Sequence, residues 1–292
     1  MQFGGTADSG AASAMFDACI EAGITHFDTA HVYTQGKSED MLRKLAAPHR
    51  DKLIIASKIG YTGGSGSSNL LAQFGDTRRR LGTDAVDVLY LHRYDPETPM
   101  DETFRTLASL QTKGQIRYIG VSNFSAWQVM KAQTAARNVG TRIDIVQPMY
   151  SLVKRQAEVE ILPMCEDQGM LAATYSPLGS GLLTGKYSKA SATGRLSSDT
   201  RYAARYAQAW MYETAKGLGT LANEQGVSAA TLAVAWAMLH PTRPCPIISA
   251  RDLQQLKPSL AALNFDMSPG LRDQISALSQ SPASATDRSE EP

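Results

Sequence analysis

Four side chains that can donate, accept or orient a proton lie at comparable places along this chain. Asp28, Lys58 and His92 each come directly after a short run of strand-forming residues, and Tyr33 lies five residues after Asp28. In a barrel of parallel strands the carboxyl ends of the strands converge on one face, where such folds carry out their chemistry. We therefore expect Asp28, Tyr33, Lys58 and His92 to lie together in one site.

A phenol, an ammonium, a carboxylate and an imidazole together suit the reduction of a carbonyl group. The Tyr33 hydroxyl has an ordinary pKa of about 10, and a neighbouring ammonium such as Lys58 favours the phenolate and lowers that pKa. Asp28 would hold the charge of Lys58, and His92 would orient a carbonyl oxygen that takes up the proton as hydride reaches carbon. The same groups would serve alcohol oxidation in reverse. Each residue alone also has an ordinary role, as a cap, a packing residue or a solvated strand end.

Strand-like and helical segments alternate through most of the chain. Strands are expected at 24–29, 53–57, 86–91, 116–121, 143–146, 170–174 and 246–248. Helices are expected at 9–22, 38–46 with Ser38 as N-cap, 68–81, 101–113, 125–137, 158–168, 210–225, 228–239, 253–263 and 271–278. The alternation predicts an α/β fold with a parallel sheet and right-handed crossovers. An eighth strand could come only from residues 1–4, which supply a stub.

The length of 292 residues fits one α/β barrel, which needs roughly 250 residues. We expect a single domain over residues 1–279 and a disordered polar tail over 280–292. In residues 186–208 the apolar residues show no clear helical or strand-like spacing, and this segment is expected to form a functional loop.

Composition narrows the class of partner. The net charge is +1 and basic residues are scattered, which argues against nucleic acid or an anionic membrane as partner. The basic run 78–80 is expected at the end of an exposed helix. Three cysteines without metal-like spacing, no apolar run of membrane-spanning length and no secretory signal favour a cytoplasmic protein without a bound metal. The sequence is silent on oligomeric state.

Several motifs, in order along the chain, resemble the aldo-keto reductase superfamily. They are Phe27-Asp28-Thr29-Ala30 with Tyr33, Ser57-Lys58, Leu91-His92-Arg93, Gly120-Val121-Ser122-Asn123-Phe124, Gln147-Pro148-Met149-Tyr150 and the stretch from Tyr175 to Tyr187. The resemblance covers about residues 3–263 and is nearer to bacterial aldo/keto reductases and the potassium-channel β-subunit-like branch than to steroid reductases. It implies a (β/α)8 TIM barrel with a shortened or missing N-terminal hairpin and first strand. It also implies Tyr33 as proton donor, Lys58 and Asp28 as the groups that tune it, and His92 as the group that orients the substrate.

The resemblance further implies a nicotinamide cofactor that lies across the barrel mouth. Ser122, Asn123 and Gln147 would bind the carboxamide, because their side chains both donate and accept, and Tyr175 would stack on the ring. The other implied cofactor-binding residues are Gly5, Ser176, Pro177, Leu178, Ser180, Gly181, Lys186, Ser249, Arg251 and Gln255. Arg251 would clamp a 2′-phosphate, which favours NADPH, with NADH possible.

Two departures from the family pattern keep alternatives open. Pro258 and Ser259 stand where the family commonly has Glu and Asn near the adenine, and the chain begins inside the family's first strand. The first departure leaves open an NAD-linked sugar or polyol dehydrogenase. A nucleotide-binding regulatory subunit with little turnover is a further alternative.

The substrate is expected to be a small carbonyl compound whose identity the sequence does not specify. The loops 61–68, 93–100 and 186–208 would shape its pocket. Aromatic candidates for the lining are Tyr61, Tyr94, Tyr202 and Tyr206. The glycine- and serine-rich stretch 63–68 is expected to be mobile.

Overall fold

The computed structural model describes residues 2–188 and 193–286, which form two compact units. The first unit comprises the described residues up to Gln147, together with Gly169–Leu171 and Ser249–Leu256. The second comprises Pro148–Gln168, Ala172–Ile248 and the described residues from Lys257 onward. Each unit is described by itself below.

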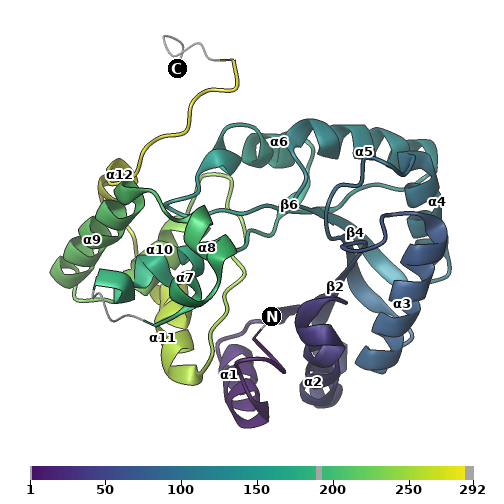
Figure 1. The fold of residues 1–292 in the computed structure, drawn as a ribbon, viewed down its shortest axis with the longest axis horizontal. Coiled ribbons are helices and arrows are strands. Elements are labelled where there is room, and N and C mark those ends of the chain that lie inside the picture. Colours follow the sequence, from purple (N-terminus) through teal and green to yellow (C-terminus); the bar gives the residue numbers. More distant parts are fainter. Residues whose placement is uncertain (1, 189–192, 287–292) are drawn as a thin grey trace. The chain divides into compact units, whose positions relative to one another are not determined.

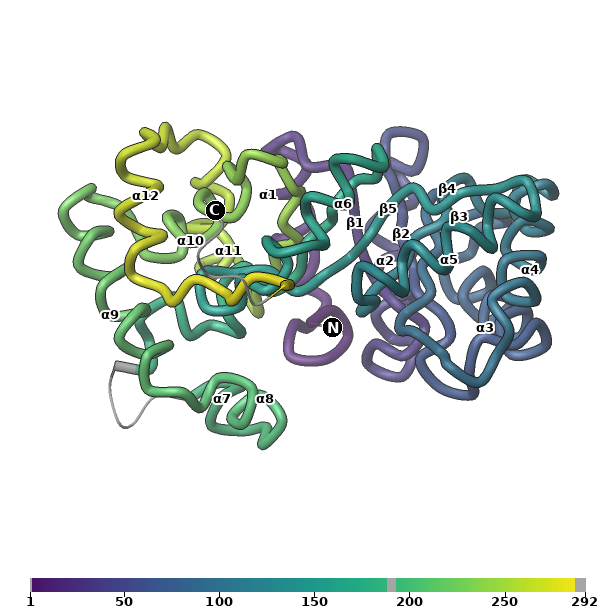
Figure 2. The backbone as a smooth tube through the Cα atoms, turned by 90° about the horizontal axis from the view of Figure 1, so that it is seen from above, coloured from purple at the N-terminus to yellow at the C-terminus, as the bar shows by residue number. Residues whose placement is uncertain are grey.

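The first unit is an alternation of strands and helices, coloured purple to teal in Figure 1. Its elements are α1 (Ser9–Glu21), β1 (His26–Asp28), η1 (Tyr33–Gly36), α2 (Lys37–Ala46), η2 (Ala47–Lys52), β2 (Ile54–Ile59), α3 (Ser67–Leu81), β3 (Val86–Leu91), α4 (Met100–Thr112), β4 (Ile116–Ser122), α5 (Ala126–Asn138) and β5 (Ile145–Gln147). Helices α3, α4 and α5 lie along the outer side of the sheet (Figures 1 and 2). All six residues of β3 are buried, as expected for a parallel strand covered on both faces.

The strands form one sheet in the order β1-β2-β3-β4-β5-β6, where β6 is Leu171–Ala172. The pairs from β1 to β5 are all parallel. The backbone N–H of Leu171 donates to Asp144 O at 2.9 Å and joins β6 to this edge. The predicted parallel α/β sheet is thus confirmed for six strands.

The sheet curves strongly between β1 and β5. In a flat sheet these strands would lie about 19 Å apart, since neighbouring strands are about 4.8 Å apart. Gln147 Nε2, at the end of β5, nevertheless donates to Asp28 Oδ2, at the end of β1, at 3.0 Å. The two side chains cannot span the flat distance, so the sheet must bend toward itself, as the strands of a barrel do.

The second unit is mainly helical. Its elements are η3 (Gln156–Glu158), α6 (Ile161–Asp167), η4 (Gly179–Thr184), η5 (Lys186–Ser188), α7 (Arg195–Ser198), α8 (Thr200–Arg205), α9 (Ala209–Glu224), α10 (Ala229–Met238), η6 (Ala262–Asn264) and α12 (Pro269–Ala277), and α11 (Leu253–Ala261) is divided between the units. Its core includes the fully buried Tyr150 and Trp236, whose rings stack with centroids 5.2 Å apart. In the described residues no helix combines the length and hydrophobicity needed to cross a bilayer.

Two predicted helix features differ from the structure. Helix α2 begins after Gly36, which has a left-handed φ of 91°, so the prediction of Ser38 as N-cap was wrong. Ser38 is buried in the first turn, where its hydroxyl accepts from Thr29 Oγ1 at 2.9 Å. Residues 186–208, expected as a loop, contain the short helices α7 and α8.

The strand predicted at 246–248 is weaker than expected, and the amino end supplies no more than the stub that was predicted. Residues 245–247 run parallel to residues 172–175 and are joined to them by three backbone hydrogen bonds and by the bridge between Tyr175 and Ile247. They nevertheless form no regular strand. At the amino end, Phe3 forms a single bridge with Ala7 across a turn. Met1 and residues 287–292 lie outside the described residues, so the disorder expected over 280–292 stays a prediction.

The close approach of β4 to β3 at Gly120 gives a stability test. A Cβ at Gly120 would overlap the buried Tyr90 ring, whereas a Cβ at Gly75 in α3 would meet nothing within 4 Å. We expect Gly120→Ala to lower the free energy of unfolding by about 1–3 kcal/mol through overpacking. Gly75→Ala, the matched control, should raise it by about 0.5–1 kcal/mol, because alanine loses less conformational entropy in a helix. Urea unfolding measures both, and equal effects of the two changes would contradict this packing.

Candidate active site

The centre of the site is the buried pair of Lys58 and Asp28. Lys58, on β2, is fully buried, and its ammonium donates to the Asp28 carboxylate and to Thr29 O at 2.8 Å. Burial lowers the pKa of Lys58, but Asp28 and then Tyr33 outweigh it, so the pKa lies above its ordinary value. Lys58 is therefore a permanent cation at neutral pH. The second carboxylate oxygen of Asp28 accepts from Gln147.

Tyr33 is carried on the loop that follows β1. The loop stays beside β2 because the His31 N–H donates to Lys58 O at 3.0 Å, and the Tyr33 N–H donates to Ala30 O at 3.0 Å. After Tyr33 the chain turns sharply through Thr34 and the next residue, both with positive φ. Lys58 Nζ lies 5.0 Å from the centroid of the Tyr33 ring. The loop thus places the phenol next to the buried ammonium.

His92 faces the same ring from the next strand. It follows β3, its N–H donates to Ile59 O at 2.8 Å, and its ring lies edge-on to Tyr33 with centroids 5.7 Å apart. Burial lowers the pKa of His92 to about 3, and the charge of Lys58 adds to the effect. His92 is therefore a neutral imidazole at physiological pH. Within the described residues its buried Nδ1 has no hydrogen-bond partner.

The residues expected to bind an amide lie at the same edge of the sheet. Ser122 Oγ donates to Gln147 O at 3.0 Å, which ties the end of β4 to the end of β5. Asn123 has φ +60°, and its Nδ2 donates to His92 O at 2.9 Å. The structure thus brings seven of the predicted residues together, namely Asp28, Tyr33, Lys58, His92, Ser122, Asn123 and Gln147.

The other predicted cofactor-binding residues are divided between the two units. Tyr175, Ser176, Pro177, Leu178, Ser180, Gly181 and Lys186 belong to the second unit, and Gly5, Ser249, Arg251 and Gln255 to the first. Ser176, Ser180 and Gly181 have positive φ, so this stretch makes tight turns, and the Gly181 N–H is used within them, since it donates to Leu178 O at 2.9 Å. At the start of α11, Asp252 Oδ1 accepts from the Gln255 N–H at 2.9 Å, so one amide of that helix start is already used.

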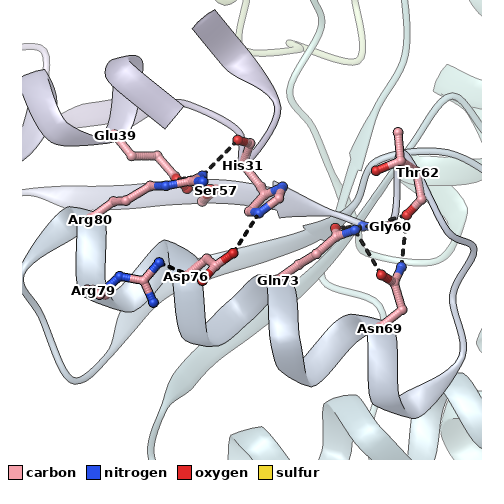
Figure 3. A network of polar contacts seen from close by, with 10 residues as sticks. All are labelled: His31, Glu39, Ser57, Gly60, Thr62, Asn69, Gln73, Asp76, Arg79 and Arg80. Carbon is pink, nitrogen blue, oxygen red and sulfur yellow. Dashed lines mark hydrogen bonds and ion pairs between the residues drawn. The ribbon is translucent and has the colours of Figure 1, made fainter. Parts of the chain in front are cut away.

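A second layer of polar contacts supports the Tyr33 loop, and sequence reasoning missed it (Figure 3). Glu39 of α2 is fully buried and accepts from Ser57 Oγ at 2.7 Å and from Arg80 Nη1 at 3.2 Å. Arg80 also donates to His31 O at 3.0 Å. The run 78–80 does lie in the last turn of α3, as predicted, but Arg80 is largely covered. A glutamate in the first turn of a helix is ordinarily solvated, so the sequence gave no signal of this contact.

The glycine-rich loop beside the site is held by side chains rather than left without contacts. Asn69 Nδ2 donates to Thr62 O at 2.8 Å and to Gly64 O at 2.7 Å, and Gln73 also donates to Thr62 O (Figure 3). The Ser65 N–H donates to Asp95 Oδ2 at 2.7 Å. These bonds give a defined conformation to the stretch that was expected to be mobile.

The buried neutral His92 predicts a pH dependence of stability. The unfolded chain protonates this residue near pH 6.5 and the folded chain only at about 3, so the unfolded state binds the extra proton between these values. Stability should therefore fall as the pH drops through this window, and His92→Asn should remove that part of the loss. Between pH 6.5 and 5 we expect the variant to lose about 2 kcal/mol less than the wild type. Urea unfolding at both pH values measures this, and identical losses would contradict a neutral His92.

Comparisons with known proteins agree with this geometry. The model of the Aldo/keto reductase family matches residues 1–280. A probable voltage-gated potassium channel subunit beta of Oryza sativa subsp. japonica is 32% identical, over 98% of this chain and 92% of its own length. An L-glyceraldehyde 3-phosphate reductase of Escherichia coli (strain K12) is 31% identical, over 84% of this chain and 76% of its own length. The predicted resemblance is confirmed: the chain belongs to the aldo/keto reductase family.

Proposed function

We propose that this protein reduces aldehydes or ketones by hydride transfer from NADPH, with Tyr33 as the proton donor. The observation that carries the proposal is the Tyr33 ring lying beside both the fully buried Lys58 and the neutral His92. Family membership and relatives named as reductases support an oxidoreductase. We further propose that the six parallel strands belong to a complete (β/α)8 barrel.

In the proposed mechanism the chain's residues handle the proton. The cofactor supplies hydride to the carbonyl carbon, and the substrate oxygen gains negative charge. Tyr33 donates its phenolic proton to that oxygen, and Lys58 stabilises the phenolate that remains. Asp28 holds the charge of Lys58, so the ammonium does not lose its own proton. His92, being neutral, can donate one hydrogen bond to the carbonyl oxygen without adding a second positive charge.

The residues present fit a nicotinamide cofactor. Ser122, Asn123 and Gln147 offer amide and hydroxyl groups at the sheet edge that carries Tyr33. The positive-φ turns from Ser176 to Gly181, in the second unit, are proposed to hold the cofactor phosphates. Arg251 is proposed to bind the 2′-phosphate, which would make NADPH the preferred cofactor.

The proposed substrates include phosphorylated aldehydes, because one relative is named for reducing L-glyceraldehyde 3-phosphate. A regulatory role is the second candidate, favoured by the relatives named as potassium channel subunits. An NAD-linked dehydrogenase would follow if Pro258 and Ser259 weaken the adenine contacts. Rates in both directions with NADPH and NADH separate these possibilities, since tight cofactor binding without turnover would favour the regulatory role.

The role of Tyr33 is tested by removing only its hydroxyl. We expect Tyr33→Phe to lower kcat for aldehyde reduction by at least about 100-fold, because the proton donor is lost. The ring stays in place, so NADPH affinity, measured by tryptophan fluorescence quenching, should be nearly unchanged. Tyr118→Phe, on an exposed tyrosine of β4, is the matched control and should keep full activity. Normal turnover in Tyr33→Phe would exclude this residue as the acid.

The role of Arg251 is tested with two cofactors. We expect Arg251→Ala to weaken NADPH binding by about tenfold or more, because a charged hydrogen bond to phosphate is worth about 1.5–3 kcal/mol. NADH lacks the 2′-phosphate, so its affinity should change little. Arg105→Ala, on an exposed arginine of α4, serves as control. An equal loss for both cofactors would remove Arg251 from the 2′-phosphate.

A further inference from the structure

One exposed arginine lies directly beside the candidate active site, within the first unit. Arg93 follows the buried His92, and its side chain is exposed. The next residue, Tyr94, is held by aromatic packing, since its ring centroid lies 5.3 Å from that of Phe124 and 5.8 Å from that of Trp127. The backbone at Arg93 is therefore fixed between two packed residues, while its side chain stays accessible.

The ring of Tyr61 sets the position of the Arg93 guanidinium. The Arg93 Cζ lies 5.0 Å from the centroid of that ring, within the range of a cation–π contact. The Tyr61 ring in turn packs against the imidazole of His92, with centroids 4.9 Å apart. These contacts form a continuous series from Arg93 to His92, whose ring already lies next to Tyr33. A contact with a ring face uses none of the five N–H donors of a guanidinium, so those of Arg93 remain for an acceptor.

The backbone around Tyr61 is held on both sides by side chains of α3. On one side the Gly60 N–H donates to Gln73 Oε1 at 2.9 Å. On the other side the Thr62 carbonyl accepts from Asn69 Nδ2 at 2.8 Å and from Gln73 Nε2 at 2.9 Å (Figure 3). The ring that carries the guanidinium is thus fixed in place, even though it is exposed.

Arg93 has no acidic partner within the part of the chain that the structure describes. It forms no ion pair and donates no hydrogen bond there. The acid nearest in sequence, Asp95, is used elsewhere, because its Oδ2 accepts from the Ser65 N–H at 2.7 Å and from Thr98 Oγ1 at 2.6 Å. Arg93 is therefore a cation without a counter-ion at the side of the site.

The charge of Arg93 acts on the place where a carbonyl oxygen would bind. Burial and then the charge of Lys58 lower the pKa of His92, and the charge of Arg93 lowers it further. A positive charge that disfavours a second cation at this place favours an anion there. Lys58 is already paired with Asp28. Arg93 is thus the cation that an anionic group close to His92 would meet.

We propose that Arg93 selects carbonyl substrates that carry an oxyanion, either a phosphate or a carboxylate, a few bonds from the carbonyl carbon. The carbonyl oxygen would lie beside Tyr33 and His92, and the oxyanion would accept hydrogen bonds from the planar guanidinium. The two contacts of Tyr61 keep the guanidinium close enough to His92 for a short carbon chain to join the two groups. This inference rests on the proposed function, whose substrates it narrows to anionic carbonyl compounds.

The first test measures binding without turnover. Glycerol 3-phosphate, which has no carbonyl group, is titrated into the full-length protein by calorimetry, with NADP+ present to occupy cofactor phosphate sites. We expect Arg93→Gln to weaken its binding by about tenfold or more, because a charged hydrogen bond is lost. The matched control is Arg105→Gln, which removes an equal charge from an exposed arginine of α4 and should leave binding unchanged. Equal effects of the two changes, or no effect of either, would overturn the proposal.

The second test identifies the anion and separates charge from shape. The ratio of kcat/KM values is measured for glyceraldehyde 3-phosphate over glyceraldehyde and for 4-oxobutanoate over butanal. We expect the wild type to prefer the anionic member of at least one pair, and that pair identifies phosphate or carboxylate as the group bound. Arg93→Gln should lower the preference about tenfold, through KM. Arg93→Glu should lower it further, because a carboxylate repels the anion.

The same measurements contain the results that would contradict the proposal. A wild type without any preference for the anionic compounds, or a preference that both Arg93 variants keep, would overturn it. A loss of NADPH affinity in the variants would assign Arg93 to the cofactor instead, with the same consequence. If the wild type reduces no carbonyl compound at all, the proposed function fails, and the calorimetric titration still decides whether Arg93 binds an oxyanion.

Discussion

The constraint on which the site depends is the complete burial of the Lys58 ammonium. Removing an ammonium from water costs several kcal/mol, and the position is tolerable only if an opposite charge and further hydrogen bonds are supplied. Parallel pairing of β1 with β2 supplies both, because the register sets Asp28 opposite Ala56, two residues before Lys58. The Thr29 carbonyl adds an acceptor. The register of the sheet is therefore what allows the Lys58 ammonium to stay charged while it is buried.

One buried cation then acts on its two neighbours with rings. In the proposed mechanism it would stabilise the phenolate that Tyr33 leaves when it donates its proton. It also disfavours the imidazolium of His92, which burial has already made costly. In the proposed mechanism the neutral histidine would orient the carbonyl oxygen, and the ammonium would stabilise the negative charge that develops. The outer contacts from Glu39 and Arg80 act on the same arrangement indirectly, through the backbone of the loop that carries Tyr33.

The order of strands and helices could be predicted because the spacing of apolar residues and the turn-forming residues at the ends of strands are local properties of a sequence. The four strand-end residues followed, since parallel strands bring their carboxyl ends to one edge. The pairing of Glu39 with Arg80 could not be predicted, because nothing local to either residue marks a partner 41 positions away. Ser38 was misread for a similar reason: its hydroxyl bonds to Thr29, a contact that only the packed fold creates. The strand at 246–248 was overestimated because a hydrophobic pattern predicts burial better than it predicts regular pairing.

The contact between Gln147 and Asp28 constrains how an amide ligand could bind here. An ionised carboxylate only accepts hydrogen bonds, so the end of the Gln147 side chain that faces Asp28 must be its NH2 group. Its Oε1, which can only accept, then points away from Asp28, and the second N–H of the NH2 group is the remaining donor. A carboxamide that bonds to Oε1 must present its own NH2 to this residue, whereas its oxygen would have to bond to the second N–H. The residue that helps hold the Lys58 charge in place is thus also the one that would orient the nicotinamide ring for hydride transfer.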